Sequence, residues 1–392
     1  MDIQFVNISI PEVFNRYHQK YNIFREFYQI GNLGLELRNI TPTNADIIQK
    51  IILSKNEICY KVVNEKKSVA DLLILGSIHS FKELSHEIVS LGNEDLGYKI
   101  NNSIRNYSEY FTQSITIGSK TFSNSESYVV GILNVTPDSF SDGGKYFNKD
   151  TAVKHALTML DDGADIIDIG GESTRPGAEK VPVEDELKRV QPVINEILKT
   201  APETILSIDT TKSEVALQAL KSGVKVVNDI SSGNLNPGIF EVIKEYNASV
   251  ILMHMKGIPQ TMQVNPYYED VVSEVYDFLN LKIKEVKKIG ITNIIIDPGI
   301  GFGKRVIDNY ELLNRLDEFK GLGFPIMVGL SRKSFIGKSL NLEIEDRDLP
   351  SAVAESIALK NGARFIRTHN VKNAVNSKKI IKFLQFPEEI NV

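Results

Sequence analysis

The pattern that most constrains the fold is an eightfold alternation that begins at Tyr128. Short apolar runs rich in Val and Ile alternate with longer stretches of helical period, which is typical of βα units around a parallel sheet. The eight apolar runs are residues 128–135, 164–171, 204–210, 225–231, 249–255, 293–299, 325–331 and 364–369. Eight units in about 265 residues favour a closed (β/α)8 TIM barrel over an open doubly wound sheet, which usually has five or six strands.

The stretches between these runs are expected to be crossover helices, because apolar residues recur along one face of each. Two such stripes, in residues 151–162 and 350–361, consist of Val153, Ala156, Leu157 and Leu160 and of Ala354, Ile357 and Ala358. The fold class is therefore α/β.

The N-terminal part of the chain lacks this alternation. Apolar runs at residues 35–40, 57–63 and 71–77, with helical segments that begin near Asn44 and carry Phe81, indicate a small α/β module. We expect residues 1–112 to form this module, with a role in packing or oligomer contact, and residues 113–392 to form the barrel domain. Residues 114–122 alternate polar and apolar side chains before a turn-rich stretch, which predicts a hairpin closing the bottom of the barrel.

Composition excludes several classes of function. The chain has 45 basic and 50 acidic side chains without a basic arm, so we expect no nucleic-acid partner. Cys59 is the one cysteine of the sequence, which rules out an internal disulfide and a cysteine metal cluster and points to a cytoplasmic location. No run approaches the roughly 20 apolar residues of a membrane span.

The active site of a TIM barrel lies at the carboxyl ends of its strands, and every predicted strand here ends in polar residues. The strand-end residues are Asn134, Asp168, Asp209, Asn228, Asp229, His254, Asp297, Ser331, Lys333, Arg367 and His369. A loop rich in small residues, 136–144, follows the first strand and is expected to move over a ligand, and residues 170–177 follow the second strand.

These side chains divide into two chemical groups. Asp209, Asn228 and Asp297 offer the acceptors and donors that match a flat heterocycle with ring nitrogens and an exocyclic amine. Arg175, Arg367 and His369 suit a phosphorylated leaving group, and the side-chain oxygen of Asn134 suits a magnesium ion. Both groups would meet at one rim of the barrel.

Structural roles compete with these interpretations. Asp168 and Asp229 could be helix caps or other scaffold residues, His254 a packed and hydrogen-bonded histidine, and Lys333 a solvated loop cation. The glycine spacing of residues 299–304 matches neither a P-loop nor a dinucleotide-binding motif, so we assign it no nucleotide role.

Seven motifs in one order carry a family resemblance. They are GILNVTPDSFSDGG from Gly131, DIGGESTRPGA from Asp168, SIDTTK from Ser207, VNDIS from Val227, DPGIGFGK from Asp297, GLSRKSFIG from Gly329 and RTHN from Arg367. Over residues 114–392 the chain resembles the dihydropteroate synthases. The resemblance implies a magnesium-dependent transferase that condenses 6-hydroxymethyl-7,8-dihydropterin diphosphate with para-aminobenzoate, is inhibited by sulfonamides and works as a homodimer.

The resemblance also implies roles for individual residues. Asp209, Asn228, Asp297 and Lys333 would hold the pterin, with Met253 against it and Arg367 stacked on its face. Asn134 would bind Mg²⁺, and Arg367 with His369 would bind diphosphate. Thr174, Arg175, Phe302 and Ser331 would contribute to the aminobenzoate site. Asp209, Asp297, Lys333 and Arg367 would be the catalytic residues, through preorganised charge rather than a covalent nucleophile.

The chain departs from the family pattern at two neighbouring positions. Asn370 stands where the family usually has Asp, and Thr368 where an apolar residue is common. Two rival interpretations remain open: a corrinoid-linked methyltransferase of the same barrel class, which needs no diphosphate or arylamine site, and a non-catalytic folate-binding or scaffolding protein.

Overall fold

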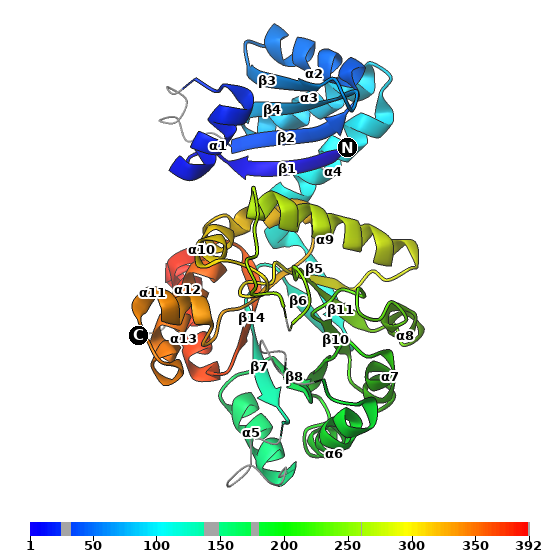
Figure 1. The fold of residues 1–392 in the computed structure, drawn as a ribbon, viewed down its shortest axis with the longest axis vertical. Coiled ribbons are helices and arrows are strands. Elements are labelled where there is room, and N and C mark those ends of the chain that lie inside the picture. Colours follow the sequence, from blue (N-terminus) through cyan, green and yellow to red (C-terminus); the bar gives the residue numbers. More distant parts are fainter. Residues whose placement is uncertain (25–32, 137–148, 174–179, 260, 391–392) are drawn as a thin grey trace. The chain divides into compact units, whose positions relative to one another are not determined.

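The computed structural model describes residues 1–24, 33–136, 149–173, 180–259 and 261–390 (Figure 1). The chain forms two compact units. The first contains Met1–Phe111 and Glu318–Gly323, and the second contains Thr112–Asp317 and Phe324–Val392.

The first unit is built on a four-stranded antiparallel sheet with strand order β1-β2-β4-β3. The strands are β1 (Asp2–Asn7), β2 (Leu33–Ile40), β3 (Ile58–Asn64) and β4 (Val69–Gly76), and the helices are α1 (Pro11–Tyr21), α2 (Pro42–Ser54), α3 (Ile78–Ser90) and α4 (Glu94–Ser108). One face of the sheet packs on α1, and the other packs on α2, α3 and α4. The sequence predicted β2, β3, β4, α2 and α3; β1, α1 and α4 were not predicted.

The second unit is the predicted TIM barrel. Its eight parallel strands close in the order β10-β11-β12-β13-β14-β7-β8-β9. They are β7 (Tyr128–Asn134), β8 (Ile166–Gly170), β9 (Ile205–Asp209), β10 (Val226–Asp229), β11 (Ser249–Met253), β12 (Ile294–Asp297), β13 (Ile326–Gly329) and β14 (Ala363–Thr368). All eight strands lie within the predicted apolar runs or differ from them by one residue.

Helices surround these strands on the outside of the barrel (Figure 1). They are α5 (Lys149–Asp161), α6 (Val183–Thr200), α7 (Ser213–Lys221), α8 (Ile239–Glu245), α9 (Val271–Lys288), α10 (Val306–Asn314), α11 (Ser334–Leu340), α12 (Asp348–Lys360) and α13 (Val371–Gln385). The prediction that Ile357 belongs to the buried stripe of α12 was wrong. Its side chain is 44% exposed, because the buried face of this helix contains Ser351 and Glu355 beside Ala354 and Ala358.

The predicted hairpin is present as β5 (Ser114–Ile117) and β6 (Lys120–Ser123). Its Ile115, Ile117 and Phe122 pack in one cluster with inward-facing residues of all eight barrel strands. Two of these, Val130 and Phe365, lie near the amino ends of β7 and β14, so the hairpin closes the bottom of the barrel and leaves the opposite end for a site. Among the residues that the structure describes, no helix has the length and apolarity to cross a membrane.

Candidate functional site

The pairing register places polar strand ends at one level of the barrel. Asn134 pairs with Gly170, Gly170 with Asp209, and Asp209 with Asn228. Because Gly170 has no side chain, Asn134 and Asp209 approach each other across it: a Cβ built on Gly170 would lie 3.8 Å from Asn134 Oδ1 and 3.6 Å from Asp209 Cβ. The register alone therefore brings three of the predicted site residues together.

The Arg367 side chain joins this group from β14, on the other side of β7. Its Nε lies 2.6 Å from Asp168 Oδ2, and its second guanidinium nitrogen lies 2.7 Å from Asp209 Oδ2. Asn228 Nδ2 also donates to Asp168 Oδ2, at 3.0 Å. Burial raises the pKa of Asp209, while the positive charge of Arg367 opposes that shift. Asp168 is thus a central residue of the site and not the helix cap that the sequence left open.

Two buried oxygens in this group lack a hydrogen-bond partner within the part of the chain that the structure describes. Asp168 Oδ1 and Asn228 Oδ1 have no hydrogen-bond partner among the described residues. Buried polar atoms of folded proteins are nearly always hydrogen-bonded, so unpaired acceptors at a strand-end rim indicate a bound molecule that donates hydrogen bonds. A ring edge that carries N–H groups and an amine meets this requirement.

Two further charged residues, Asp297 and Lys333, lie at the end of β12 and in the loop after β13. The Asp297 carboxylate is 4% exposed, and its Oδ1 accepts the Gly299 N–H at 2.7 Å. Burial raises the pKa of Asp297. It also lowers the pKa of Lys333 to about 8, although the charge of Asp297 opposes that shift. Lys333 is half-buried and not a solvated loop residue, and its Nζ lies 4.0 Å from the centroid of the Phe302 ring.

An apolar wall completes this part of the site. Met253, at the end of β11, packs with Ile230, Met255 and Met262, and Phe302 packs against the cluster. Thioether and aromatic groups give a polarisable surface for a flat ring. The wall begins beside Asp297, because Met253 pairs with Asp297 in the barrel.

Ser331 and His369 link the ends of β13 and β14. Ser331 Oγ accepts the His369 backbone N–H at 3.2 Å and lies 3.1 Å from His369 Nδ1. The two departures from the family pattern, Thr368 and Asn370, lie on either side of His369 in the sequence. Thr368 Oγ1 accepts the Asn370 N–H, while Asn370 Oδ1 accepts the Asn373 N–H and so caps α13.

Other strand-end residues support the scaffold. The Asp229 carboxylate accepts hydrogen bonds from Ser231 N, Ser231 Oγ and Gly233 N within its own loop. His254 is a packed, hydrogen-bonded histidine, 6% exposed and 2.9 Å through Nδ1 from Lys304 Nζ. Burial lowers the pKa of this histidine well below its usual value. Both residues thus take the structural roles that the sequence left open.

Lys304 is the residue that the sequence analysis missed. Its buried Nζ donates to the carbonyls of Gly299 (2.8 Å) and Phe302 (3.0 Å), and burial lowers its pKa to about 7. It holds the β12–α10 loop, which carries Phe302, in its folded shape. A signal existed in the glycine-rich stretch before it, since repeated glycines favour positive φ, and glycines 299, 301 and 303 all adopt it.

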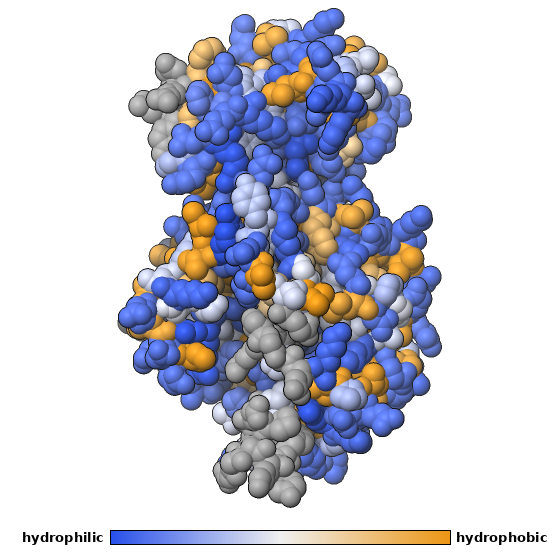
Figure 2. Space-filling model, viewed as in Figure 1, coloured by the Kyte–Doolittle hydropathy of each residue, from blue (hydrophilic) through white to orange (hydrophobic). Residues whose placement is uncertain are grey.

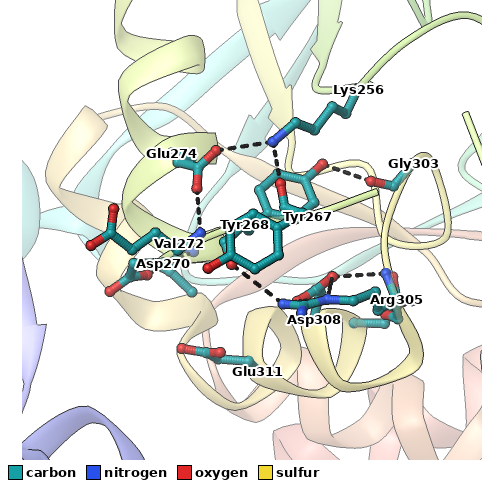
Figure 3. Close-up of polar contacts among 12 residues, drawn as sticks. Lys256, Tyr267, Tyr268, Asp270, Val272, Glu274, Gly303, Arg305, Asp308 and Glu311 are labelled. Carbon is teal, nitrogen blue, oxygen red and sulfur yellow. Dashed lines mark hydrogen bonds and ion pairs between the residues drawn. The ribbon is translucent and has the colours of Figure 1, made fainter. Parts of the chain in front are cut away.

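A polar network extends this support to the loop between β11 and α9 (Figure 3). Tyr268 Oη donates to the Gly303 carbonyl at 2.7 Å, and Lys256 pairs with Glu274 at 3.2 Å. Arg305 binds Asp308 through both Nε and a terminal nitrogen. The network ties neighbouring loops of the rim together.

The remaining predicted residues concern the metal and the loops that follow β7 and β8. Thr174 and Arg175, with loop residues 137–144, lie outside the described residues. In the described part of the chain, no cluster of three or more His, Cys, Asp or Glu residues could hold a metal. Asn134 supplies one hard oxygen at the rim, which is what the protein contributes where Mg²⁺ is held mainly by substrate phosphates and water.

Comparisons with known proteins agree with this geometry. The family model described as pterin binding enzyme matches residues 130–369. Dihydropteroate synthase of Escherichia coli strain K12 is 46% identical over 260 residues, which cover 66% of this chain and 92% of that protein. The Synechocystis enzyme is 45% identical over 269 residues, 68% of this chain and 93% of that protein.

Solved structures show the same relationship. The dihydropteroate synthase of Yersinia pestis in a sulfonamide drug complex matches with a TM-score of 0.66 and 41% identity, over 70% of this chain and 99% of that one. The Xanthomonas albilineans enzyme with 4-aminobenzoic acid has a TM-score of 0.66 and 40% identity, again over 70% and 99%. The chain therefore belongs to the dihydropteroate synthase family of pterin-binding enzymes.

Proposed function

We propose that the barrel condenses 6-hydroxymethyl-7,8-dihydropterin diphosphate with para-aminobenzoate to give 7,8-dihydropteroate and diphosphate. The observation that carries this proposal is the pair of unpartnered buried oxygens, on Asp168 and Asn228, beside the guanidinium of Arg367. These acceptors fit the donor edge of a pterin, and the cation fits both the ring face and the leaving group.

The pterin would bind with its amine-bearing edge toward the carboxylates. Asp297 Oδ1 is committed to the Gly299 N–H, so Oδ2 is the oxygen that would accept from the ring. Lys333 would donate to a ring acceptor, and the Met253 cluster would contact the ring from one side. The low exposure of these groups strengthens each interaction.

The reaction follows from the charges around this pocket. The bond between the pterin methylene carbon and the diphosphate oxygen breaks, and the electron pair leaves with diphosphate. The carbocation is stabilised by the electron-rich ring and by Asp209 and Asp297. The arylamine nitrogen then bonds to this carbon and loses a proton. Preorganised charge carries catalysis, so no covalent nucleophile is needed.

The leaving group would be bound by Arg367 and His369, with Mg²⁺ on Asn134. Arg367 is held in place by Asp168 and Asp209, and His369 by Ser331. A bound Mg²⁺ would neutralise negative charge on the diphosphate. Thr174, Arg175, Phe302 and Ser331 would form the aminobenzoate site, and the structure of the Xanthomonas relative contains 4-aminobenzoic acid.

We also propose that the protein is a cytoplasmic homodimer. Helix α12 exposes Leu349, Val353 and Ile357, which are spaced four residues apart and are 73%, 56% and 44% exposed. Its neighbour α13 exposes Ile380 and Leu384. Figure 2 shows hydrophobic side chains among hydrophilic ones over this part of the barrel. An apolar stripe across two adjacent helices suits a subunit contact. The single cysteine suits a reducing compartment.

The test is release of diphosphate from the pterin substrate. We expect release with para-aminobenzoate present and none without it, with dihydropteroate as the product. Release without the arylamine would indicate a hydrolase. Methyl transfer from methyltetrahydrofolate to a corrinoid would support the rival methyltransferase, and pterin binding without turnover would support a binding protein.

A further inference from the structure

We infer that Asp348, the first residue of α12, is a positioning residue that couples the loop after β13 to the loop after β14. The inference rests on the proposed function, because these two loops carry Lys333 and His369. Asp348 acts through Arg332 and Asn370.

Arg332 lies between the two site residues Ser331 and Lys333 in an unfavourable backbone conformation. Its φ is +56°, in the left-handed region that few non-glycine residues adopt. Such a conformation persists only where the surroundings hold it. The direction in which Lys333 leaves the loop depends on this one residue.

The start of α12 supplies the contacts that hold Arg332. Asp348 Oδ1 lies 2.6 Å from Arg332 Nε, and Oδ2 lies 2.9 Å from a terminal guanidinium nitrogen. Ser351 Oγ accepts the Arg332 backbone N–H at 3.0 Å, and an Arg347 guanidinium nitrogen donates to the Arg332 carbonyl at 3.3 Å. Both the backbone and the side chain of Arg332 are therefore fixed, with bidentate geometry at the carboxylate.

The same carboxylate reaches the other loop. Asp348 Oδ2 accepts a hydrogen bond from Asn370 Nδ2 at 3.1 Å. Asn370 directly follows His369 and uses its Oδ1 to cap α13, so its amide has one available orientation. Aspartate at position 370 could cap the helix but could not donate to Asp348. Asn370 therefore serves this contact through its amide group.

The partial exposure of Asp348 and Arg332 indicates that their ion pair fixes the conformation of the loop after β13 more than it stabilises the fold. The side chains of Asp348 and Arg332 are 24% and 40% exposed, and exposed ion pairs contribute little to folding. The pKa of Asp348 is lowered by its hydrogen bonds with Arg332, so the carboxylate stays ionised at neutral pH. Losing it would release a loop while leaving the barrel folded.

The experiment compares Asp348→Ala with Asp346→Ala, which removes an exposed carboxylate from the preceding turn. Tryptic cleavage after Arg332 or Lys333 reports the loop itself and needs no catalysis. Steady-state kinetics report the site. We expect Asp348→Ala to be cut at least about tenfold faster and to have a KM for the pterin diphosphate raised about tenfold, with its melting temperature almost unchanged. Asp348→Glu should recover part of both effects.

A double-mutant cycle tests the route through Arg332. Arg332→Ala added to Asp348→Ala should have little further effect, because both changes break the same interaction. The inference would be overturned if Asp348→Ala matched Asp346→Ala in cleavage rate, or if the two losses were additive. A wild-type enzyme that made no dihydropteroate would refute the proposed function, while the cleavage rates would still decide the role of Asp348.

Discussion

Replacing Asp297 with Asn exchanges one oxygen of a buried carboxylate for an NH2 group and leaves the side-chain volume almost unchanged. The orientation of the new amide is set by the backbone. Its oxygen must face the Gly299 N–H, which approaches Asp297 Oδ1 to 2.7 Å, so its NH2 group must occupy the position of Oδ2. A donor then faces the donor edge of the pterin, and the negative charge that favours the Lys333 ammonium is lost. The substitution replaces an attraction with a repulsion at the centre of the site.

The size of the effect follows from these contacts. A hydrogen bond to a charged group contributes about 1.5–3 kcal/mol, and an unpaired buried donor adds a desolvation penalty. We expect a loss of about 3 kcal/mol in pterin binding, or roughly a 150-fold higher Kd. The fold should tolerate the change. Because burial raises the pKa of Asp297, its charge opposes folding at neutral pH, and the neutral amide removes that cost.

Calorimetric titration with a pterin measures the affinity, and thermal unfolding measures the stability. Asp229→Asn is the matched control, since Asp229 is also a buried strand-end carboxylate. Both of its oxygens accept hydrogen bonds within its own loop, from Ser231 and Gly233. This control substitution should lower the melting temperature and leave the pterin Kd unchanged. A Kd within about threefold of wild type for Asp297→Asn would refute the orientation argument.

Three further predictions follow from the site. Lys333→Met should weaken pterin binding yet raise the unfolding temperature at neutral pH, because burial disfavours the ammonium. In the wild type, the affinity for pterin should fall as the pH rises through about 8, where Lys333 loses its proton. Lys304→Met should lower the free energy of unfolding in urea by about 1–3 kcal/mol, because it removes the hydrogen bonds that Nζ donates to the Gly299 and Phe302 carbonyls. An unchanged midpoint would contradict the support role of Lys304. Diphosphate with Mg²⁺ should raise sulfonamide affinity in calorimetry about tenfold or more, because the sequence predicts that bound diphosphate organises two loops of the aminobenzoate site. Equal affinities would rule out that coupling.

The barrel itself was predictable because its strands are covered on both faces. The sequences of such strands are nearly continuous apolar runs, and eight of them with crossover helices predict a closed barrel. The first unit was harder to interpret. In β1, Gln4 is a buried polar residue, and in α4 the buried face includes Gly97 and Ser103, so neither element shows a clean apolar period.

The rim residues were predictable by position but not by partner. Any polar residue that ends a barrel strand must face the rim, which is why Asp209, Asn228 and Arg367 could be named from the sequence. That Arg367 binds Asp168 and Asp209 follows only from closure of the barrel, which brings β14 beside β7 and so near β8 and β9. Sequence separations of 199 and 158 residues hide such a contact from any local pattern.

Asp348 shows where local interpretation fails for a physical reason. An acidic residue in the first turn of a helix is sufficiently explained by the helix dipole, so the sequence gives no cause to look further. Its second role depends on the backbone of Arg332, whose positive φ turns the guanidinium toward α12. A conformation that unfavourable is not encoded by Arg332 itself; Ser351, Arg347 and Asp348 impose it from another element. Residues that position a catalytic side chain such as Lys333 can therefore belong to a different element from that side chain and still lie close to it in space.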